Sequence, residues 1–408
     1  MQVMSASTKG TLGSAYARQR NSLNFLRLTL ALVVLGTHTV AIGGFHTISS
    51  VNGTTFGQIA VFGFFGISGY LITGSALRNH LGRYLWQRFL RIFPGFWICL
   101  AMTALFFGVI GWLSQAHPHC GWDCYFNASR NNPFDYVYRN SLLKINQASI
   151  SGTPRNVPLP LIWDQSLWTL FYEFICYLLL AGLALIGFLR HRVWTLLGTV
   201  LLWGVVTAVT LTPRWNAQFN LFQNWSLMNI LKFSVVFMVG AVIYLYRDRI
   251  PDSGWLALAC AGLFIASLWL PTGGQVPDFK FTSSFLLAPL VAYPLLWLGI
   301  HLPFQAVGAE NDYSYGVYIY AWPASQLLAI WGAWRWGYVV FTLLCLLAVI
   351  PFAVASWWLI EKRALSLKRI DFREVWIWAV GPKRGGISEA EGLGVSSSVG
   401  GEAEGQQM

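Results

Sequence analysis

Ten apolar runs, each long enough to cross a bilayer, constrain this chain more than any other feature. A hydrocarbon core of about 30 Å takes about 20 apolar residues per helix, and it leaves no water for unpaired backbone groups. With 55% hydrophobic and only 11% charged residues, the sequence predicts an all-α, polytopic membrane protein with about ten transmembrane helices. The expected spans are 23–42, 57–77, 92–113, 166–188, 193–211, 227–246, 255–271, 284–300, 314–333 and 338–360.

Lysine and arginine indicate the orientation of these spans. An even number of spans places both termini on one side, and most of the 27 Lys and Arg residues fall in the segments that share that side. Cytoplasmic loops carry such an excess, so both termini are expected in the cytoplasm and the protein in the cell (plasma or inner) membrane. The net charge of +11 is then a topology signal, and we expect membrane lipids and no nucleic acid as partners.

Three regions follow from this topology. Residues 1–22 form a cytoplasmic N-terminal segment, and residues 23–370 form the membrane domain with an outer loop at 114–163. Residues 371–408 are rich in Gly, Ser and Glu from Gly385 onward and predict a largely disordered cytoplasmic tail.

Two cysteines of the outer loop have two interpretations. Cys120 and Cys124 lie in HPHCGWDC on the oxidising side, where a disulfide is favoured. The alternative is a metal site completed by His117 and His119. We expect the disulfide and no metal.

Arg27 and His38 are costly residues within the first apolar run. They are eleven positions apart, close to three helical turns, so their side chains share one face about 16 Å apart along the axis. Arg27 is expected towards the cytoplasm and His38 in the outer half of the helix. Ionisable groups at such depths are candidate functional residues.

Glu173 is the acidic residue expected deepest in a span. With Arg27 and His38 it predicts a shared polar cavity, in which Glu173 orients His38 or stabilises its cation. The alternative is structural: a neutral imidazole bonded to a neighbouring helix, and a glutamate paired with Arg27. Lys232, near the outer end of its span, can reach water, and a role in the site is the less favoured interpretation.

Small and basic residues mark the next two segments. Gly63, Gly66 and Gly69 predict a face for close helix packing, and Ser68 among them is a candidate for lining a ligand path. Arg88 and Arg91, expected in an inner loop over 76–97, share a helical face and are candidates for binding a phosphate group.

Six stretches together resemble the acyltransferase-3 family of integral membrane O-acyltransferases. The first is the Arg-x10-His pair at Arg27 and His38. The others are FFGISGYLIT (64–73), RFLRIFP (88–94), SLWTLFYEFICY (166–177), DYSYGVYIYAWP (312–323) and WLIEKRALSLKR (358–369). The order of the six is that of the family.

The resemblance implies transfer of an acyl group, acetyl or another short one, from cytoplasmic acyl-CoA to a hydroxyl of a cell-envelope carbohydrate or glycolipid. No bound cofactor is expected, since acyl-CoA is a substrate. His38 and Glu173 are the expected catalytic residues, with His38 as general base. The expected substrate-binding residues are Arg27, Ser68, Arg88, Arg91 and Tyr315.

The chain departs from the family pattern at three places, one of which is Thr169, where serine is usual. Ala321 stands where many members carry histidine, and Arg363 or Ala364 replaces the closing proline. The sequence lacks the esterase-like domain of some relatives, which favours a stand-alone transferase. A proton-coupled transporter or flippase is the alternative function, and an inactive scaffolding relative is a third.

Overall fold

A computed structural model of the chain describes residues 10–18, 21–47, 49–51, 53–115, 121–129, 131–211, 225–269 and 284–369. They belong to one compact unit that ends at Arg369. The predicted tail at 371–408, His117, His119 and Cys120 lie outside the described residues.

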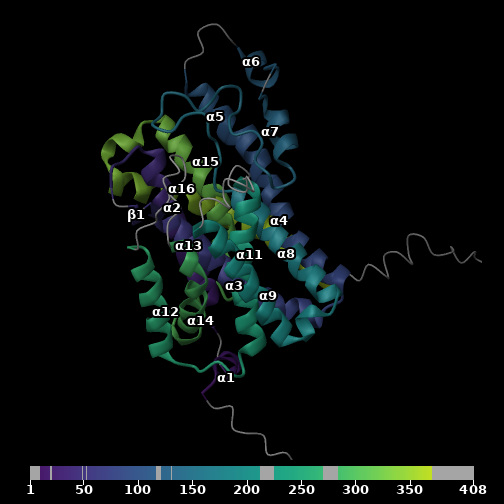
Figure 1. Cartoon of the computed structure of the whole chain (residues 1–408). Coiled ribbons are helices and arrows are strands. Elements are labelled where there is room, and N and C mark those ends of the chain that lie inside the picture. The colour runs from purple at the N-terminus through teal and green to yellow at the C-terminus, as the bar shows by residue number, and fades with distance from the viewer. Residues whose placement is uncertain are drawn as a thin grey trace, which may run out of the picture. The chain divides into compact units, whose positions relative to one another are not determined.

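Helices dominate the described chain, as the apolar runs predict (Figure 1). The α-helices of the first half are α1 Leu12–Arg18, α2 Leu23–Ile42, α3 Phe56–Arg78, α4 Leu81–Met102, α5 Gly108–Leu113, α6 Trp122–Phe126, α7 Pro133–Asn140 and α8 Trp168–Leu185. Those of the second half are α9 Arg192–Leu211, α11 Trp225–Tyr246, α12 Gly254–Ser267, α13 Ser284–Leu287, α14 Ala292–His301, α15 Ser314–Ile330, α16 Tyr338–Ser356 and α17 Lys362–Ser366.

Tighter and wider helical turns join these elements. The 3-10 turns are η2 Phe188–Arg190, η3 Ala288–Val291, η4 Ala333–Trp336 and η6 Leu367–Arg369. The π-helical turns are η1 Thr103–Phe107 and η5 Trp357–Glu361, each inside a longer helix. Two short strands, β1 Ser50–Val51 and β2 Thr54–Thr55, pair antiparallel before α3.

All ten predicted spans coincide with apolar helices. Seven helices of the described chain are long and apolar enough to cross a membrane, and α12 and the η3–α14 segment are shorter apolar helices. The remaining one, α15, has 17 residues and is buried along almost its whole length. An all-α polytopic membrane protein is therefore confirmed.

The expected inner loop at 76–97 is wrong. From Leu81 the chain is helical, and α4, η1 and α5 form one helix of 33 residues that ends at Leu113. The His80 side chain caps its start by accepting a hydrogen bond from the Arg83 backbone N–H. Arg88 and Arg91 consequently sit on a continuous helix that extends about three turns beyond the predicted start of the span.

Glycines let α3 and α11 pack in direct backbone contact. A Cβ on Gly69 would overlap the Phe237 carbonyl oxygen, and one on Gly240 would overlap the Gly66 carbonyl oxygen. A Cβ on Gly63 would overlap the side chain of Leu295, so this glycine lets α3 pack closely on α14. The predicted small-residue face is confirmed, and α3 lies at the centre of the bundle.

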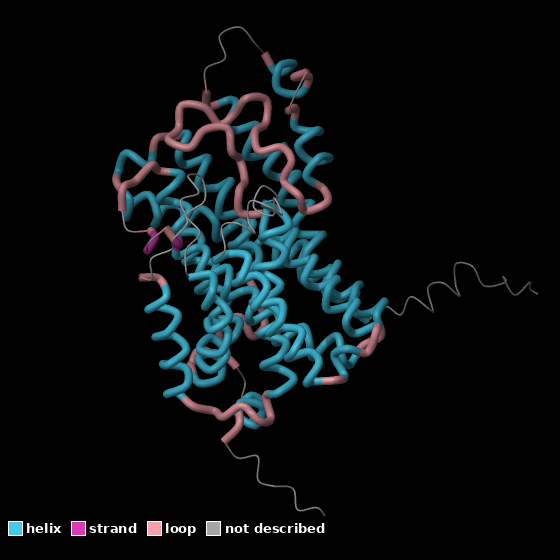
Figure 2. Tube along the Cα trace, in the orientation of Figure 1, coloured by secondary structure: helices cyan, strands magenta, loops and turns pink. Residues whose placement is uncertain are grey.

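The loops of the described chain gather mainly at one end of the bundle, as Figure 2 shows. This end carries α6 and α7 of the long loop between α5 and α8, while α1 lies at the opposite end (Figure 1). Cys124, in α6, is disulfide-bonded, which favours the structural interpretation of the loop cysteines. Cys99, Cys176, Cys260 and Cys345 are free.

Candidate functional site

A basic cavity of about 380 Å³ lies among α2, α3, α4, α8 and the start of α15. We use this name for the cavity whose lining includes the cations Arg27, Arg88, Arg91 and Lys368. Three carboxylates, Glu173, Glu310 and Asp312, also line it, so positive charge is in excess. All five predicted substrate-binding residues belong to this lining: Arg27, Ser68, Arg88, Arg91 and Tyr315.

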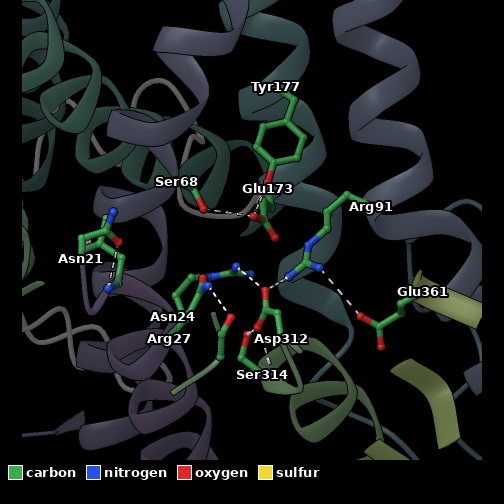
Figure 3. Close-up of polar contacts among 12 residues, drawn as sticks. Asn21, Asn24, Arg27, Ser68, Arg91, Glu173, Tyr177, Asp312, Ser314 and Glu361 are labelled. Atoms are coloured by element: carbon green, nitrogen blue, oxygen red, sulfur yellow. Dashed lines mark hydrogen bonds and ion pairs between the residues drawn. The ribbon is translucent and has the colours of Figure 1, made fainter. Parts of the chain in front are cut away.

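Asp312 organises the charges of the basic cavity (Figure 3). Its Oδ2 lies 2.8 Å from Arg27 Nη1 and 2.6 Å from Arg91 Nη2, and its Oδ1 accepts a hydrogen bond from Ser314 Oγ. Burial alone raises the pKa of Asp312, but the Arg27 and Arg91 guanidinium groups outweigh burial and hold the pKa below its ordinary value. Asp312 is therefore ionised, and it ties α2 to α4 through one carboxylate.

Arg91 has a second carboxylate partner. Its Nη1 lies 3.8 Å from Oε2 of Glu361, the last residue of the π-helical turn η5. The Arg91 guanidinium also lies 5.6 Å from the centroid of the Tyr315 ring. The Tyr315 hydroxyl donates to the Ile92 carbonyl oxygen at 2.7 Å, so this predicted substrate-binding residue holds α15 against α4.

Arg88 differs from Arg91 in having no carboxylate partner among the described residues. Its guanidinium carbon lies 5.9 Å from the Tyr84 ring centroid and 5.7 Å from that of Tyr177, and its Nε is buried without a hydrogen-bond partner. A buried donor without a partner is costly, and an anion in the cavity would satisfy it. Arg88 is thus the arginine of this cavity best placed to bind a ligand phosphate.

Lys368 adds a cation at the η6 side of the basic cavity. Burial, together with the positive charges of Arg91 and Arg88, lowers the pKa of Lys368 to about 8. An approaching anion would reverse that repulsion and favour the charged form.

Glu173 also belongs to the basic cavity. Its Oε1 accepts hydrogen bonds from Ser68 Oγ at 3.2 Å and from the Tyr177 hydroxyl (Figure 3). The carboxylate therefore joins α3 to α8 and faces the cations.

His38 lines a second and larger cavity of about 550 Å³. We call it the His38 cavity. Its walls include the aromatic residues Phe62, Trp168, Phe233, Tyr318 and Trp322, and its polar lining includes Ser166, Asn229 and Lys232. The His38 ring meets the Trp322 ring edge to face at 4.6 Å, and its Nδ1 is buried without a hydrogen-bond partner.

The predicted contact between Glu173 and His38 is wrong. The two residues line different cavities, and the hydrogen bonds of Glu173 go to Ser68 and Tyr177. The single shared cavity is accordingly replaced by two, with Arg27 and Glu173 in one and His38 in the other. The reason is position along the helices: His38 lies eleven residues, or three turns, beyond Arg27, whereas Glu173 faces the same basic cavity as Arg27.

The two cavities are stacked along the same four helices. On α8, Thr169 lines the His38 cavity and Glu173 lines the basic cavity; on α15 the corresponding pair is Tyr318 and Tyr315. These separations of three to four residues amount to roughly one helical turn, or about 5 Å. The Thr169 and Tyr318 hydroxyls are hydrogen-bonded to each other at this level.

Sequence reasoning missed Asp312 and Glu361 as members of the site. Both lie at the ends of predicted spans, where a carboxylate is ordinarily solvated. Their signal was present in the family-like stretches 312–323 and 358–369, which begin with or contain them. Ala321 is buried in α15, and it is not among the residues that line the two cavities.

The comparisons with known proteins agree with this architecture. Residues 20–358 match the family model described as an acyltransferase domain, and the chain therefore belongs to the acyltransferase-3 family of integral membrane proteins. It is an enzyme that transfers acyl groups. The chain is 27% identical over 352 residues to the O-acetyl transferase of Shigella phage Sf6, an alignment that covers 85% of this chain and 96% of that protein. No solved structure matches the chain.

Proposed function

We propose that this enzyme transfers a short acyl group, such as acetyl, from acyl-CoA to a hydroxyl of a cell-envelope carbohydrate or glycolipid. One observation carries the proposal: a cavity rich in cations and a cavity containing a histidine share four helices, and on α8 and α15 their lining residues come within about one helical turn of each other. A donor and an acceptor bound in these cavities would meet at the wall between them.

The basic cavity suits the phosphate groups of the donor. Arg88 offers a buried donor group without a partner, and Lys368 adds a second cation to which no carboxylate is bonded in the described chain. Arginine binds phosphate through its planar fork of donors. Arg27 and Arg91 are already paired with Asp312, so we assign them to holding the cavity in shape.

The His38 cavity suits a sugar acceptor. Aromatic rings form much of its wall, and side chains that can hydrogen-bond a sugar, such as Gln165, Ser166 and Asn229, lie among them. In our proposal a neutral His38 takes the proton from the acceptor hydroxyl as its oxygen attacks the thioester carbonyl carbon. The new C–O bond forms, the C–S bond breaks, and the proton passes to the departing CoA thiolate.

The proposed role of Glu173 differs from the one expected from the sequence. Because Glu173 faces the basic cavity, we assign it to positioning Ser68 and Tyr177 in the lining of that cavity. It does not act through His38 in this scheme.

The decisive experiment measures acyl transfer from radiolabelled acetyl-CoA to envelope glycans in membranes that contain equal amounts of wild-type or variant protein. We expect His38→Ala to reduce transfer by about 100-fold or more, the scale of lost general-base catalysis. The matched control is His191→Ala, because His191 is exposed and lies outside both cavities. Retained transfer in His38→Ala would remove His38 from the mechanism.

The transporter alternative predicts a different outcome from the same membranes. A transporter would move an envelope intermediate across the bilayer without consuming acetyl-CoA, and purified protein would not bind the coenzyme. Acyl-CoA binding that weakens in Arg88→Gln supports the transferase, since Arg88 lines the basic cavity.

A further inference from the structure

Trp322 is the aromatic residue of the His38 cavity that contacts the histidine itself. The centroids of the Trp322 and His38 rings lie 4.6 Å apart, and the two ring planes meet at 66°, an edge-to-face arrangement. Trp322 is 2% exposed, and its side chain lines the same cavity as His38. The role inferred for Trp322 rests on the proposed function, in which His38 is the general base.

A histidine that acts as general base becomes positively charged, and in many enzymes a carboxylate stabilises that charge. The lining residues of the His38 cavity that the structure describes include no aspartate or glutamate, and His38 Nδ1 is buried without a hydrogen-bond partner. Lys232 and His46 in this lining are bases, and Tyr318 is a phenol that donates a hydrogen bond, so none supplies a negative charge. The electron-rich group in contact with the His38 ring is the Trp322 indole.

Hydrogen bonds to the segment before α8 fix the Trp322 indole in this position. Its Nε1 donates to the Ile162 carbonyl oxygen at 3.2 Å. One turn further along α15, Gln326 Nε2 donates to the carbonyl oxygens of Leu159 and Ile162, both at 2.9 Å. The indole therefore cannot turn away from His38 without breaking its own hydrogen bond.

Contacts with α16 fix the part of α2 that carries His38. The Thr39 and Thr342 hydroxyls are hydrogen-bonded to each other at 2.8 Å, and the Tyr338 hydroxyl donates to the Gly36 carbonyl oxygen at 3.3 Å. The contact between the two rings is thus built into the fold. A group held in place in advance can stabilise a developing charge without a cost of reorganisation.

We infer that Trp322 is a positioning residue that stabilises the imidazolium of His38 by a cation–π interaction. In the proposed reaction His38 takes the proton of the acceptor hydroxyl as its oxygen attacks the thioester carbonyl carbon, and this proton later passes to the CoA thiolate. Between these two proton transfers the edge of the imidazolium lies against the face of the indole. A group that favours this charge lowers the barrier to transfer without changing the binding of either substrate.

Fluorinated tryptophans at position 322 test the inference, because each fluorine withdraws electron density from the indole while its size changes little. Purified enzyme with tryptophan or with mono-, di- or trifluorotryptophan at this position alone is compared in transfer from radiolabelled acetyl-CoA to envelope glycans. We expect kcat and the single-turnover rate to fall stepwise, by about 10-fold across the series. The KM values for acetyl-CoA and for the acceptor should not change, which also shows that the proteins are folded.

Further variants assign the effect to the contact with His38. The same analogues at Trp331, which is 58% exposed and donates its Nε1–H to Ser114, should leave kcat unchanged. In His38→Ala, trifluorotryptophan at position 322 should not lower the residual transfer further, since the imidazolium no longer forms. Trp322→Leu should lower kcat by about 10- to 30-fold and Trp322→Phe by less, because phenylalanine keeps a weaker aromatic face.

The same measurements separate failure of this inference from failure of the proposed function. A kcat that stays constant across the fluorinated series overturns the inference, and so does a rise in the acceptor KM at constant kcat, which would mean that Trp322 stacks on the sugar. Both results leave the transferase intact. If the enzyme with its native tryptophan transfers no label from acetyl-CoA, the proposed function is wrong and the inference fails with it.

Discussion

Arg88 and Arg91 lie one turn apart on α4, yet their side chains have different surroundings. Arg91 contacts Asp312 and Glu361, whereas Arg88 rests between the Tyr84 and Tyr177 rings with its Nε unpartnered. An arginine already neutralised by carboxylates has less to offer a phosphate than one that is not. At the scale of single residues, we therefore expect Arg88 to bind substrate and Arg91 to hold the fold.

Glutamine at these two positions should therefore have different effects. We expect Arg88→Gln to raise the KM for acyl-CoA by about 10- to 100-fold, the value of a charge-assisted hydrogen bond, with little change in thermal stability. Arg91→Gln leaves the buried Glu361 without its cationic partner and Asp312 with Arg27 alone, and it should cost about 3–5 kcal/mol of stability. Thermal unfolding in detergent and acetyl-CoA kinetics distinguish the two variants. Equal losses of stability in both would contradict a structural role for Arg91 and a binding role for Arg88.

Asp164 provides a pH-dependent prediction. Its side chain is buried, with Oδ1 accepting from Ser166 and Oδ2 without a hydrogen-bond partner, and burial raises its pKa from 3.8 to about 8. The folded state then holds a proton that the unfolded state has released, so stability is full below the unfolded pKa and falls as pH rises towards about 8.

Asp164→Asn removes this titration while keeping a side chain of the same shape. Unfolding midpoints measured in detergent from pH 4 to pH 9 should decline less steeply for the variant than for the wild type. Parallel profiles would mean that Asp164 does not carry the raised pKa.

At the scale of elements, the site depends on how closely the helices approach. Asp312, in the connection before α15, joins α2 and α4, and Glu361 is brought to the same cluster by the π-helical turn at the end of α16. A π turn adds one residue to the helical repeat and rotates the helix beyond it, and such turns are frequent at functional sites. The α3–α11 contact holds Ser68 of one cavity and Lys232 of the other on packed helices.

Alanine at Gly69 tests the α3–α11 contact. The new Cβ would overlap the Phe237 carbonyl oxygen, which belongs to a backbone that cannot move away without separating the helices. We expect a loss of about 1–3 kcal/mol, typical of overpacking, measured as a lower unfolding temperature. Gly262→Ala in α12 is the control, because nothing lies within 4 Å of its added Cβ and alanine favours a helix. An unfolding temperature that Gly69→Ala leaves unchanged would show that α3 and α11 are not in backbone contact.

At the scale of the whole molecule, the direction of transfer depends on how the bundle sits in the membrane. The distribution of Lys and Arg predicts that the end carrying α7 faces outward and the loop after α11 faces the cytoplasm. In that orientation, the function we propose has acyl-CoA entering the basic cavity from the cytoplasm and an outward-facing acceptor entering the His38 cavity.

Cysteine labelling tests this orientation. Tyr138 in α7 is 80% exposed, and Arg249 after α11 is exposed as well. A membrane-impermeant maleimide applied to intact cells should label Tyr138→Cys, and it should label Arg249→Cys only after permeabilisation. The wild-type protein gives the background of its native cysteines, and the reverse pattern would invert the topology.

Local patterns in the sequence were enough to predict the helical membrane fold, the positions of ten apolar helices and six of the residues that line the basic cavity. Apolar runs, charge bias and the ordered family-like stretches are local signals, and they can be recognised without knowing how the helices pack. The packed structure was needed to find that His38 and Glu173 face different cavities, that Asp312 neutralises Arg27 and Arg91, and that Lys232 lines the His38 cavity. These facts depend on helix rotation and on contacts between residues far apart in the chain, such as the 285 positions between Arg27 and Asp312. Spacing along one helix fixes which residues share its face, but packing fixes what that face meets.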